Sequence, residues 1–164
     1  MVIVQFAGGH SNQMFQYAAA RSLALQNNTE LRFSMEWFKH MEGVKSPRHF
    51  ELDAYNIVGK IQSRGFAQRV VNKFKRVQYF EQRDFSFDPA FRSLGPNVYL
   101  IGDFQSEKYF KDIRSVLLED FSYKKPAHGK NAMLLKTINN DPTAVSLHIR
   151  RGDYVNDAET NAMH

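Results

Sequence analysis

The stretch of sequence that decides the fold is residues 2–18, VIVQFAGGHSNQMFQYA. Its first part, residues 2–6, is a short apolar run rich in β-branched side chains, which is typical of a buried strand. The Ala-Gly-Gly sequence at residues 7–9 indicates a tight turn. We expect a helix next, with Ser11 or Asn12 as its N-cap, because short polar side chains accept hydrogen bonds from the first free amides of a helix.

The predicted helix has one face of small and apolar side chains, and a second strand follows it. The residues of this face follow one another at spacings of one, three and four residues, and they are Met14, Phe15, Ala18, Ser22 and Leu25. Residues 30–34 read as the strand, with Leu31 and Phe33 on the same side. A strand, a glycine turn, a helix and a second strand are the opening of an α/β fold.

The remaining elements extend the same pattern. We expect an amphipathic basic helix over residues 66–77, a strand over 97–104, a helix over 106–121, a linker over 124–130, a short helix over 132–139 and a final strand over 144–149. Strands separated by helices predict an open, largely parallel sheet. Ligands of such sheets bind outside the carboxyl ends of the strands, so the chemistry should be sought there.

Composition bounds the kind of protein. The chain has 164 residues, 43% of them hydrophobic and 24% charged, which fits a soluble globular protein and excludes disordered and collagen-like classes. It has no cysteine, which excludes disulfides and thiolate chemistry. No apolar run approaches the roughly 18 to 20 residues of a membrane span and nothing resembles an export signal, so we expect a cytoplasmic protein.

The net charge of +5 favours anionic partners. The basic stretch at residues 64–83 either rests on anionic lipid, giving peripheral contact with the inner membrane face, or is a solvated helix face. A basic module that binds nucleic acid is the alternative function, and it predicts affinity that falls steeply with salt.

The glycine segment is the first candidate site. Gly8 and Gly9 would let backbone amides approach a ligand closely, and the helix that follows offers free N–H groups to an anion. Asn12 and Gln13 place two amide side chains at this helix start, where they can contact a ligand directly. The alternatives are a purely structural turn and an Asn12 that only caps the helix.

The second candidate site is residues 144–154, AVSLHIRRGDY. Because side chains alternate across a strand, His148 and Arg150 share its polar face. A guanidinium binds phosphate oxygens in pairs and keeps its charge, so this face suits a pyrophosphate. Asp153 would pair with Arg150 or Arg151 and hold it still. The alternative is an ordinary Arg–Asp bridge at a strand end.

These two segments carry a specific resemblance. Together with FELD at residues 50–53 and GDFQSEKYF at residues 102–110, they resemble the α-1,2-fucosyltransferases of glycosyltransferase family 11 over essentially the whole chain. The most specific element is HIRRGD at residues 148–153. The resemblance implies half of a GT-B-type, Rossmann-like enzyme plus the start of its second half. It also implies inverting transfer of fucose from GDP-fucose to the 2-hydroxyl of a galactose-terminated glycan, without a metal or another cofactor.

The resemblance also implies roles for individual residues. By it, Arg150 would contact the β-phosphate and stabilise the departing GDP, and Asn12 would lie near the phosphates or the transferred sugar. The catalytic set would be Arg150, Asn12 and Asp153, and the substrate-binding set His148, Arg151, Gly8, Gly9 and Gln13. The sequence has no D-x-D motif and no compact His and carboxylate cluster, in keeping with a cation in place of a metal.

The family pattern bears on the organisation of the chain as well. Residues 1–143 would form the N-terminal α/β domain, and residues 144–164 would start the nucleotide-sugar-binding region. Family members continue beyond this point, so we expect this chain to be an N-terminal portion that is inactive alone; a complete short protein is the alternative. The family usually has Leu-Gly where this chain has His10-Ser11, and Ser11 would be strained in a turn that required positive φ.

Two smaller features have two interpretations each. Asp103 and Glu107 flank the predicted helix start at Ser106, where they either deprotonate an acceptor hydroxyl or complement the helix N-terminus. Trp37 either stacks on a sugar or belongs to the core.

Overall fold

The computed structural model describes residues 1–41, 43, 47–62, 77–147 and 149. The chain divides into two compact units, Met1–Lys125 and Pro126–His164. This division falls within residues 124–130, the segment expected to be a linker. The domain boundary expected at residues 143 and 144 stays a prediction, because most of residues 144–164 lie outside the described part. The predicted basic helix lies outside it too, except for Val77.

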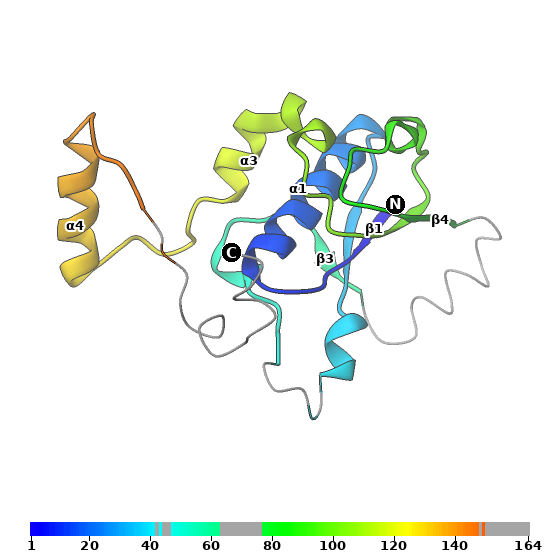
Figure 1. Ribbon diagram of the computed structural model, residues 1–164, viewed down its shortest axis with the longest axis horizontal. Helices are drawn as coiled ribbons and strands as arrows, with labels where there is room; N and C mark the ends of the chain where they lie inside the picture. Colours follow the sequence, from blue (N-terminus) through cyan, green and yellow to red (C-terminus); the bar gives the residue numbers. More distant parts are fainter. Residues whose placement is uncertain (42, 44–46, 63–76, 148, 150–164) are drawn as a thin grey trace. The chain divides into compact units, whose positions relative to one another are not determined.

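The first unit is built on an open, five-stranded sheet in which every pair of neighbouring strands is parallel (Figure 1). Its strands are β1 (Val2–Gln5), β2 (Leu31–Ser34), β3 (Lys60–Ile61), β4 (Gln78–Glu81) and β5 (Val98–Ile101), in the order β3-β2-β1-β5-β4. In register, Val2 lies beside Leu31 on one side and beside Val98 on the other. The predicted α/β class with a parallel sheet is confirmed, as are its strands β1, β2 and β5.

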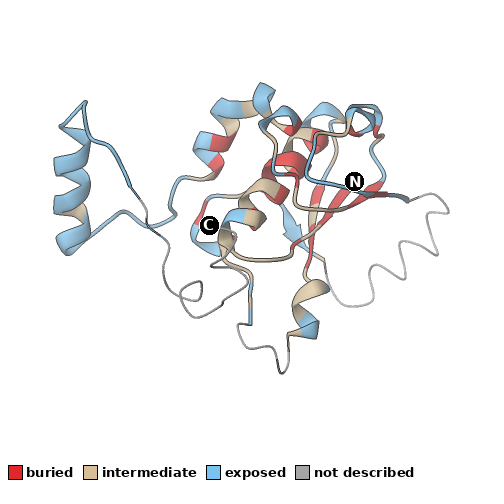
Figure 2. Ribbon diagram, in the orientation of Figure 1, coloured by how far each residue is buried: buried red, intermediate tan, exposed pale blue. Residues whose placement is uncertain are grey.

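Helix α1 (His10–Gln26) connects β1 to β2 and packs against both strands. Its buried side is rich in alanine, and Figure 2 shows buried residues along α1 and in the strands beside it. The predicted apolar face was partly wrong, since Leu25 is 41% exposed whereas Leu23 and Ala24 are buried. The small alanine side chains let the helix lie close to the sheet, and the larger Leu23 is buried beside them.

The segment after β5 is not the single helix expected over residues 106–121. It forms two 3₁₀ turns, η4 (Glu107–Tyr109) and η5 (Lys111–Ile113), before a short helix, α3 (Arg114–Asp120). Tyr109 is only 3% exposed and packs on the rings of Phe87, Phe91 and Phe104, while Phe110 packs on Phe15. The break lets two consecutive aromatic side chains enter the protein, which a regular helix would point about 100° apart.

A buried polar cluster ties α3 to α1. The Tyr17 hydroxyl donates to Asp120 Oδ2 over 2.6 Å, and Arg21 Nε donates to the same oxygen over 2.9 Å. The Tyr17 hydroxyl also accepts from the Val58 amide at 2.9 Å. Burial, together with the hydrogen bond to Asp120, raises the pKa of Tyr17 well above its ordinary value. Asp120 is 6% exposed and gains a charged partner and a neutral donor, so its burial is compensated.

Three further 3₁₀ turns connect the strands, namely η1 (Trp37–His40), η2 (Leu52–Ala54) and η3 (Pro89–Ser93). Trp37 in η1 is half-buried and packs edge to face on Phe38. The turn η2 buries Leu52 completely, and Phe50 just before it packs on Phe6 and Phe33. Phe50 and Leu52 of the FELD motif are therefore part of the core beside β1 and β2, whereas Asp53 is exposed.

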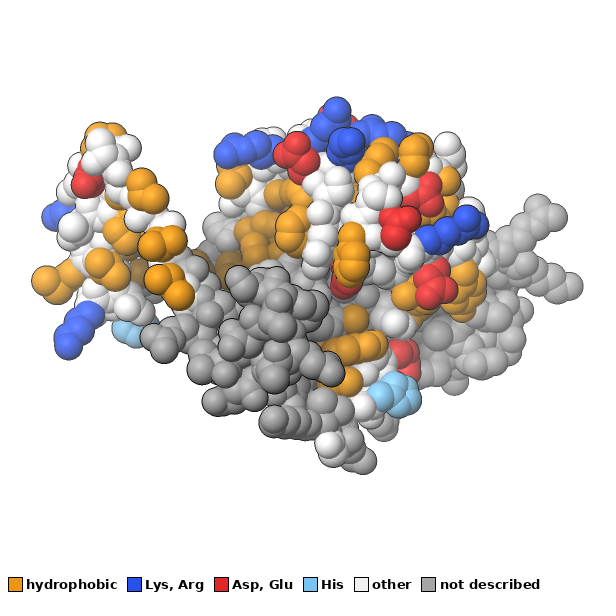
Figure 3. Space-filling view, viewed as in Figure 1, with side chains coloured by type: hydrophobic (Ala, Val, Ile, Leu, Met, Phe, Trp, Pro, Cys, Tyr) orange, Lys and Arg blue, Asp and Glu red, His pale blue; other side chains and the backbone are white. Residues whose placement is uncertain are grey.

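The second unit contains α4 (Gly129–Asn139), which confirms the short helix predicted there. Figure 3 shows hydrophobic side chains on this helix, and Met133 is 73% exposed and Leu134 59%. The final strand expected over residues 144–149 is wrong for the residues described, since 144–147 and 149 have no strand conformation and Val145 is 91% exposed. A strand needs a neighbour for its backbone hydrogen bonds, and these residues pair with none in the described part of the chain.

Candidate functional site

The strand order reverses between β1 and β5. From β1 the chain passes through α1 to β2 on one side, whereas β5 lies on the other side of β1. Both strands are parallel, so the segments that follow them, residues 6–9 and 102–106, leave from the same edge of the sheet (Figure 1). In open parallel sheets ligands bind at this topological position. The predicted site residues Gly8, Gly9, Asn12 and Gln13 all follow the carboxyl end of β1.

The glycine turn depends on Gly8. Its φ of +70° is unfavourable for other residues, and a Cβ added there would lie 2.7 Å from Asn12 Nδ2. Gly9 has an extended backbone and is the N-cap of α1, so the expected capping by Ser11 or Asn12 is wrong. Ser11 lies inside the helix and not at positive φ, so the expected strain is absent. The turn places its positive φ one residue before the cap, which sequence spacing does not reveal.

Asn12 joins the two segments that leave the sheet. Its Nδ2 lies 3.4 Å from Asp103 Oδ1, and its Oδ1 accepts a hydrogen bond of 3.1 Å from Gln105 Nε2. Both partners follow β5 and lie more than 90 residues away in sequence. The amide of Asn12 therefore connects the carboxyl ends of β1 and β5, where the strand order reverses.

Gln13 is a structural support of the turn. It is fully buried, and its Nε2 donates to the carbonyl oxygens of Gly8 at 3.1 Å and His49 at 2.8 Å. Its Oε1 accepts from the Glu51 amide at 2.9 Å. The amide thus fastens residues 49–51 to the glycine turn with hydrogen bonds to the backbone alone. Its expected contact with a substrate stays a prediction.

Gln82 supports the second segment in the same manner, and no motif or spacing in the sequence indicates this role. Its Oε1 accepts from the amides of Asp103 at 3.1 Å and Phe104 at 2.7 Å. Phe104 is fully buried at φ +53°, a conformation that residues other than glycine rarely adopt. Gly102 has φ +148°, and a Cβ there would lie 2.6 Å from Gln82 Cβ. Two glutamines therefore hold the two turns that flank the site.

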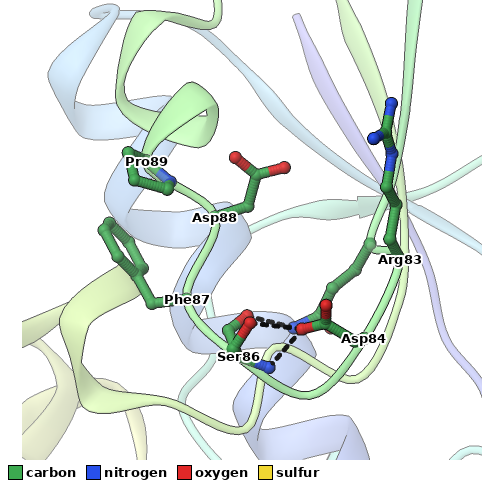
Figure 4. Close-up of a pocket in the computed structure, with 7 residues that line it drawn as sticks. Arg83, Asp84, Ser86, Phe87, Asp88 and Pro89 are labelled. Atoms are coloured by element: carbon green, nitrogen blue, oxygen red, sulfur yellow. Dashed lines mark hydrogen bonds between the residues drawn. The ribbon is translucent and has the colours of Figure 1, made fainter.

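Gln82 also lines a cavity of about 220 Å³ at the carboxyl end of β4, together with Arg83, Asp84, Ser86, Phe87, Asp88 and Pro89 (Figure 4). The Asp84 carboxylate accepts from both the amide and the hydroxyl of Ser86, and these hydrogen bonds hold the pKa of Asp84 below its ordinary value. Asp88 caps η3 by accepting from the Ala90 amide. Its lining residues follow the carboxyl end of β4, which is parallel to β5.

An aromatic group borders the start of α1. His10 Nε2 lies 3.0 Å from the Tyr55 hydroxyl, and the Tyr55 ring stacks on Tyr123 with centroids 4.8 Å apart. The Tyr55 hydroxyl donates to that of Tyr123 at 3.4 Å, and this bond together with burial raises the pKa of Tyr55 to about 12. His10, which replaces the leucine usual in the family pattern, is therefore part of this group beside Gly9.

The structure places Asp103 and Glu107 in different surroundings, although the sequence allowed the same two roles for both. Asp103 contacts Asn12 at the site, whereas Glu107 lies in the first turn of η4, whose N-cap is Ser106. The predicted functional residues of the second candidate site, His148, Arg150, Arg151 and Asp153, lie outside the described residues. Their expected roles stay predictions.

The described residues show neither a metal cluster nor a membrane-spanning helix. Within them no group of three or more His, Cys, Asp or Glu side chains gathers where a metal ion would be held. Metal independence stays a prediction. No described helix is both long and apolar enough to span a bilayer.

Comparison with known proteins gives one family and one relative. The model of the family described as glycosyl transferase family 11 matches residues 1–164. An Escherichia coli protein named alpha-1,2-colitosyltransferase is 31% identical over 179 residues, an alignment covering 100% of this chain and 59% of the relative. The chain therefore spans about three fifths of that relative's length. No solved structure matches significantly.

The family model covers the two segments from which the resemblance was drawn, the glycine turn and HIRRGD, along with everything between them. The family predicted from the sequence is thereby confirmed. The chain belongs to glycosyl transferase family 11.

Proposed function

We propose that the protein to which this chain belongs is a glycosyltransferase that moves fucose from GDP-fucose to the 2-hydroxyl of a terminal galactoside, with inversion and without a metal. The observation that carries the proposal is the family match over residues 1–164. The position of Asn12 supports it, because this side chain lies where parallel sheets bind their ligands.

The start of α1 suits an anionic donor. This helix of 17 residues has no acidic side chain in its first turn, and its N-cap Gly9 has no side chain to occupy the free amides. The partial positive charge of a helix N-terminus favours phosphate. Arg150, in the family motif, would supply the fixed cation. Charge accumulates on the leaving phosphate oxygen in the transition state, and a positioned donor there is worth roughly 3 to 4 kcal/mol.

The relative bears on the donor sugar. Its name assigns it the transfer of colitose through an α-1,2 linkage. Colitose is the 3-deoxy analogue of fucose, so a closely similar pocket can serve either sugar. We propose fucose for this chain, with GDP-colitose as the donor to compare, and we propose that both would use the same nucleotide contacts.

A chimera tests the proposal. Residues 1–164 would replace the matched region of the Escherichia coli colitosyltransferase, and transfer from GDP-fucose and GDP-colitose to a β-galactoside would be measured. We expect transfer, and we expect Arg150→Lys to lower turnover about 10²- to 10³-fold, because an ammonium cannot reproduce the planar guanidinium. Arg114→Lys, on the exposed side of α3, is the matched control and should leave turnover unchanged.

Binding by the 164-residue chain gives a second test that does not need turnover. GDP and a short single-stranded oligonucleotide would be titrated at low and high salt. We expect GDP to bind better than GMP, which lacks the pyrophosphate. Oligonucleotide affinity that falls linearly with salt on logarithmic axes, without any preference for GDP, would favour the nucleic-acid-binding alternative instead. Wild-type turnover in the Arg150→Lys chimera would contradict the proposal.

A further inference from the structure

We infer that Asp103 is the general base of the proposed transfer, and that Asn12 and Gln82 hold its carboxylate and its backbone in place. The inference rests on the proposed function and gives a role to Asp103, a residue to which the family resemblance assigns none. Three observations lead to it: where the backbone of Asp103 is held, what its side chain contacts, and which other duties it lacks.

The backbone at Asp103 is fixed from two sides. Its amide donates to Gln82 Oε1 at 3.1 Å, and the next amide, of Phe104, donates to the same oxygen at 2.7 Å. Before it, Gly102 has φ +148° and lies too close to Gln82 for any Cβ. After it, Phe104 is buried at positive φ. The backbone conformation at Asp103, just after the carboxyl end of β5, is therefore fixed. Strained backbone of this kind clusters at functional sites.

The side chain of Asp103 is oriented by Asn12. Gln105 Nε2 donates to Asn12 Oδ1 at 3.1 Å, so the NH₂ end of the Asn12 amide faces Asp103, where Nδ2 lies 3.4 Å from Oδ1. One such hydrogen bond leaves most of the acceptor capacity of a carboxylate unused. Asp103 is half-buried, so a substrate hydroxyl can reach it.

Within the described residues, Asp103 does not cap the turn that follows it, so helix capping does not explain a carboxylate at this position. The N-cap of η4 is Ser106, whose hydroxyl accepts from the Lys108 amide, and the acidic residue of its first turn is Glu107. Among the described carboxylates, Asp103 is the one in contact with Asn12. Gln82, whose Oε1 accepts from the Asp103 amide, also lines the cavity at the carboxyl end of β4.

The chemistry that follows is a single displacement. The acceptor hydroxyl gives its proton to the Asp103 carboxylate while its oxygen forms a bond to the anomeric carbon of the donor sugar. The bond from that carbon to the phosphate oxygen breaks, and the electron pair leaves with GDP. Attack from the face opposite GDP inverts the anomeric centre. The proton held by Asp103 then passes to water, and no oxidant or further reactant is needed.

The test compares Asp103→Asn with Glu107→Gln, which removes an equal charge four residues away in an exposed position. Both substitutions would be made in the chimera described above, and transfer from GDP-fucose to a β-galactoside and affinity for GDP would be measured for each. We expect Asp103→Asn to lower turnover by about 10²- to 10⁴-fold with GDP affinity unchanged, as for loss of a general base. Glu107→Gln should match the wild type in both measurements.

A second variant, Asp103→Ala, tests the role as base without introducing a new amide side chain. Asp103→Ala should lose turnover as well, and added formate should restore part of it by acting as a diffusible base. Wild-type turnover in Asp103→Asn would overturn the role as base. So would a loss of both turnover and GDP affinity in Asp103→Ala, with no response of turnover to formate. Absence of transfer by the chimera without either substitution would instead end the proposed function, and the base with it.

Discussion

Asn12 and Asp103, 91 residues apart in sequence, meet through an amide nitrogen and a carboxylate oxygen 3.4 Å apart where the strand order of the sheet reverses. One residue belongs to the first turn of α1 and the other follows β5. The contact therefore depends on the pairing of β1 with β5, and it makes the two turns one site.

Asn12→Asp tests this contact. The substitution would place a second carboxylate beside Asp103, and two like charges at this separation repel by about 1 to 4 kcal/mol. We expect the free energy of unfolding to fall by an amount in this range at pH 7, measured by urea denaturation. The loss should shrink at about pH 4, where carboxylates take up protons. An equal loss at both pH values would mean that Asn12 acts through packing.

Serine substituted at Gly8 and at Gly9 tests the glycine turn with the same change at adjacent positions. Gly8→Ser should lower the free energy of unfolding by at least about 1 to 2 kcal/mol, because of its φ of +70° and the close approach of Asn12. Gly9→Ser should be neutral or stabilising, since among the described residues a Cβ there meets the Arg48 side chain alone, at 3.7 Å, and serine is a preferred N-cap. Equal thermal stability of the two variants would contradict this account of the turn.

Gln13→Leu tests the buried support of the site. Leucine would leave two carbonyl oxygens and one amide of the backbone without partners, so we expect a loss of at least about 2 kcal/mol in urea denaturation. Gln26→Leu is the matched control, because Gln26 is exposed on the same helix and makes one hydrogen bond, to the Arg92 carbonyl. That control should cost about 0.5 kcal/mol or less.

Tyr17→Phe tests the cluster that ties α3 to α1 through its pH dependence. The pKa of Tyr17 is raised from 10.0, chiefly by burial, so the folded protein keeps the phenol proton at a pH where the unfolded chain releases it. Wild-type stability should therefore fall as pH rises above about 10, with a contribution from Tyr17 of at most about 1.4 kcal/mol per pH unit.

Phenylalanine has no such proton, so the variant should be less stable at pH 7 but should lose stability less steeply between about pH 10 and 11.5. Urea denaturation at several pH values gives the two slopes. Parallel slopes would show that Tyr17 does not titrate with unfolding. Tyr55, Tyr99 and Tyr109 also have raised pKa values, and they remain in both proteins.

The sequence predicted the elements whose conformation depends on their own residues and not on partners far away in the chain. The apolar run before Gly8 forms β1, and the expected helix follows the turn. The helix expected over residues 132–139 is α4, which covers Gly129–Asn139. The helix expected over residues 106–121 failed because Tyr109 finds a buried place among three aromatic rings, which helical periodicity does not register. The strand expected over 144–149 failed for its described residues because alternation of apolar side chains does not supply a neighbouring strand.

The sequence by itself determined the fold class, the glycine turn, the family and the presence of Asn12 at a helix start, because these depend on neighbouring residues and on a local motif. The tertiary structure alone decided that Gln13 is buried support, that Gln82 fixes the turn after β5, and that Asp103 rather than Glu107 contacts Asn12. Each of these depends on β1 pairing with β5 and β5 with β4. Strand order is set by how the whole core packs, and no short stretch of sequence records it.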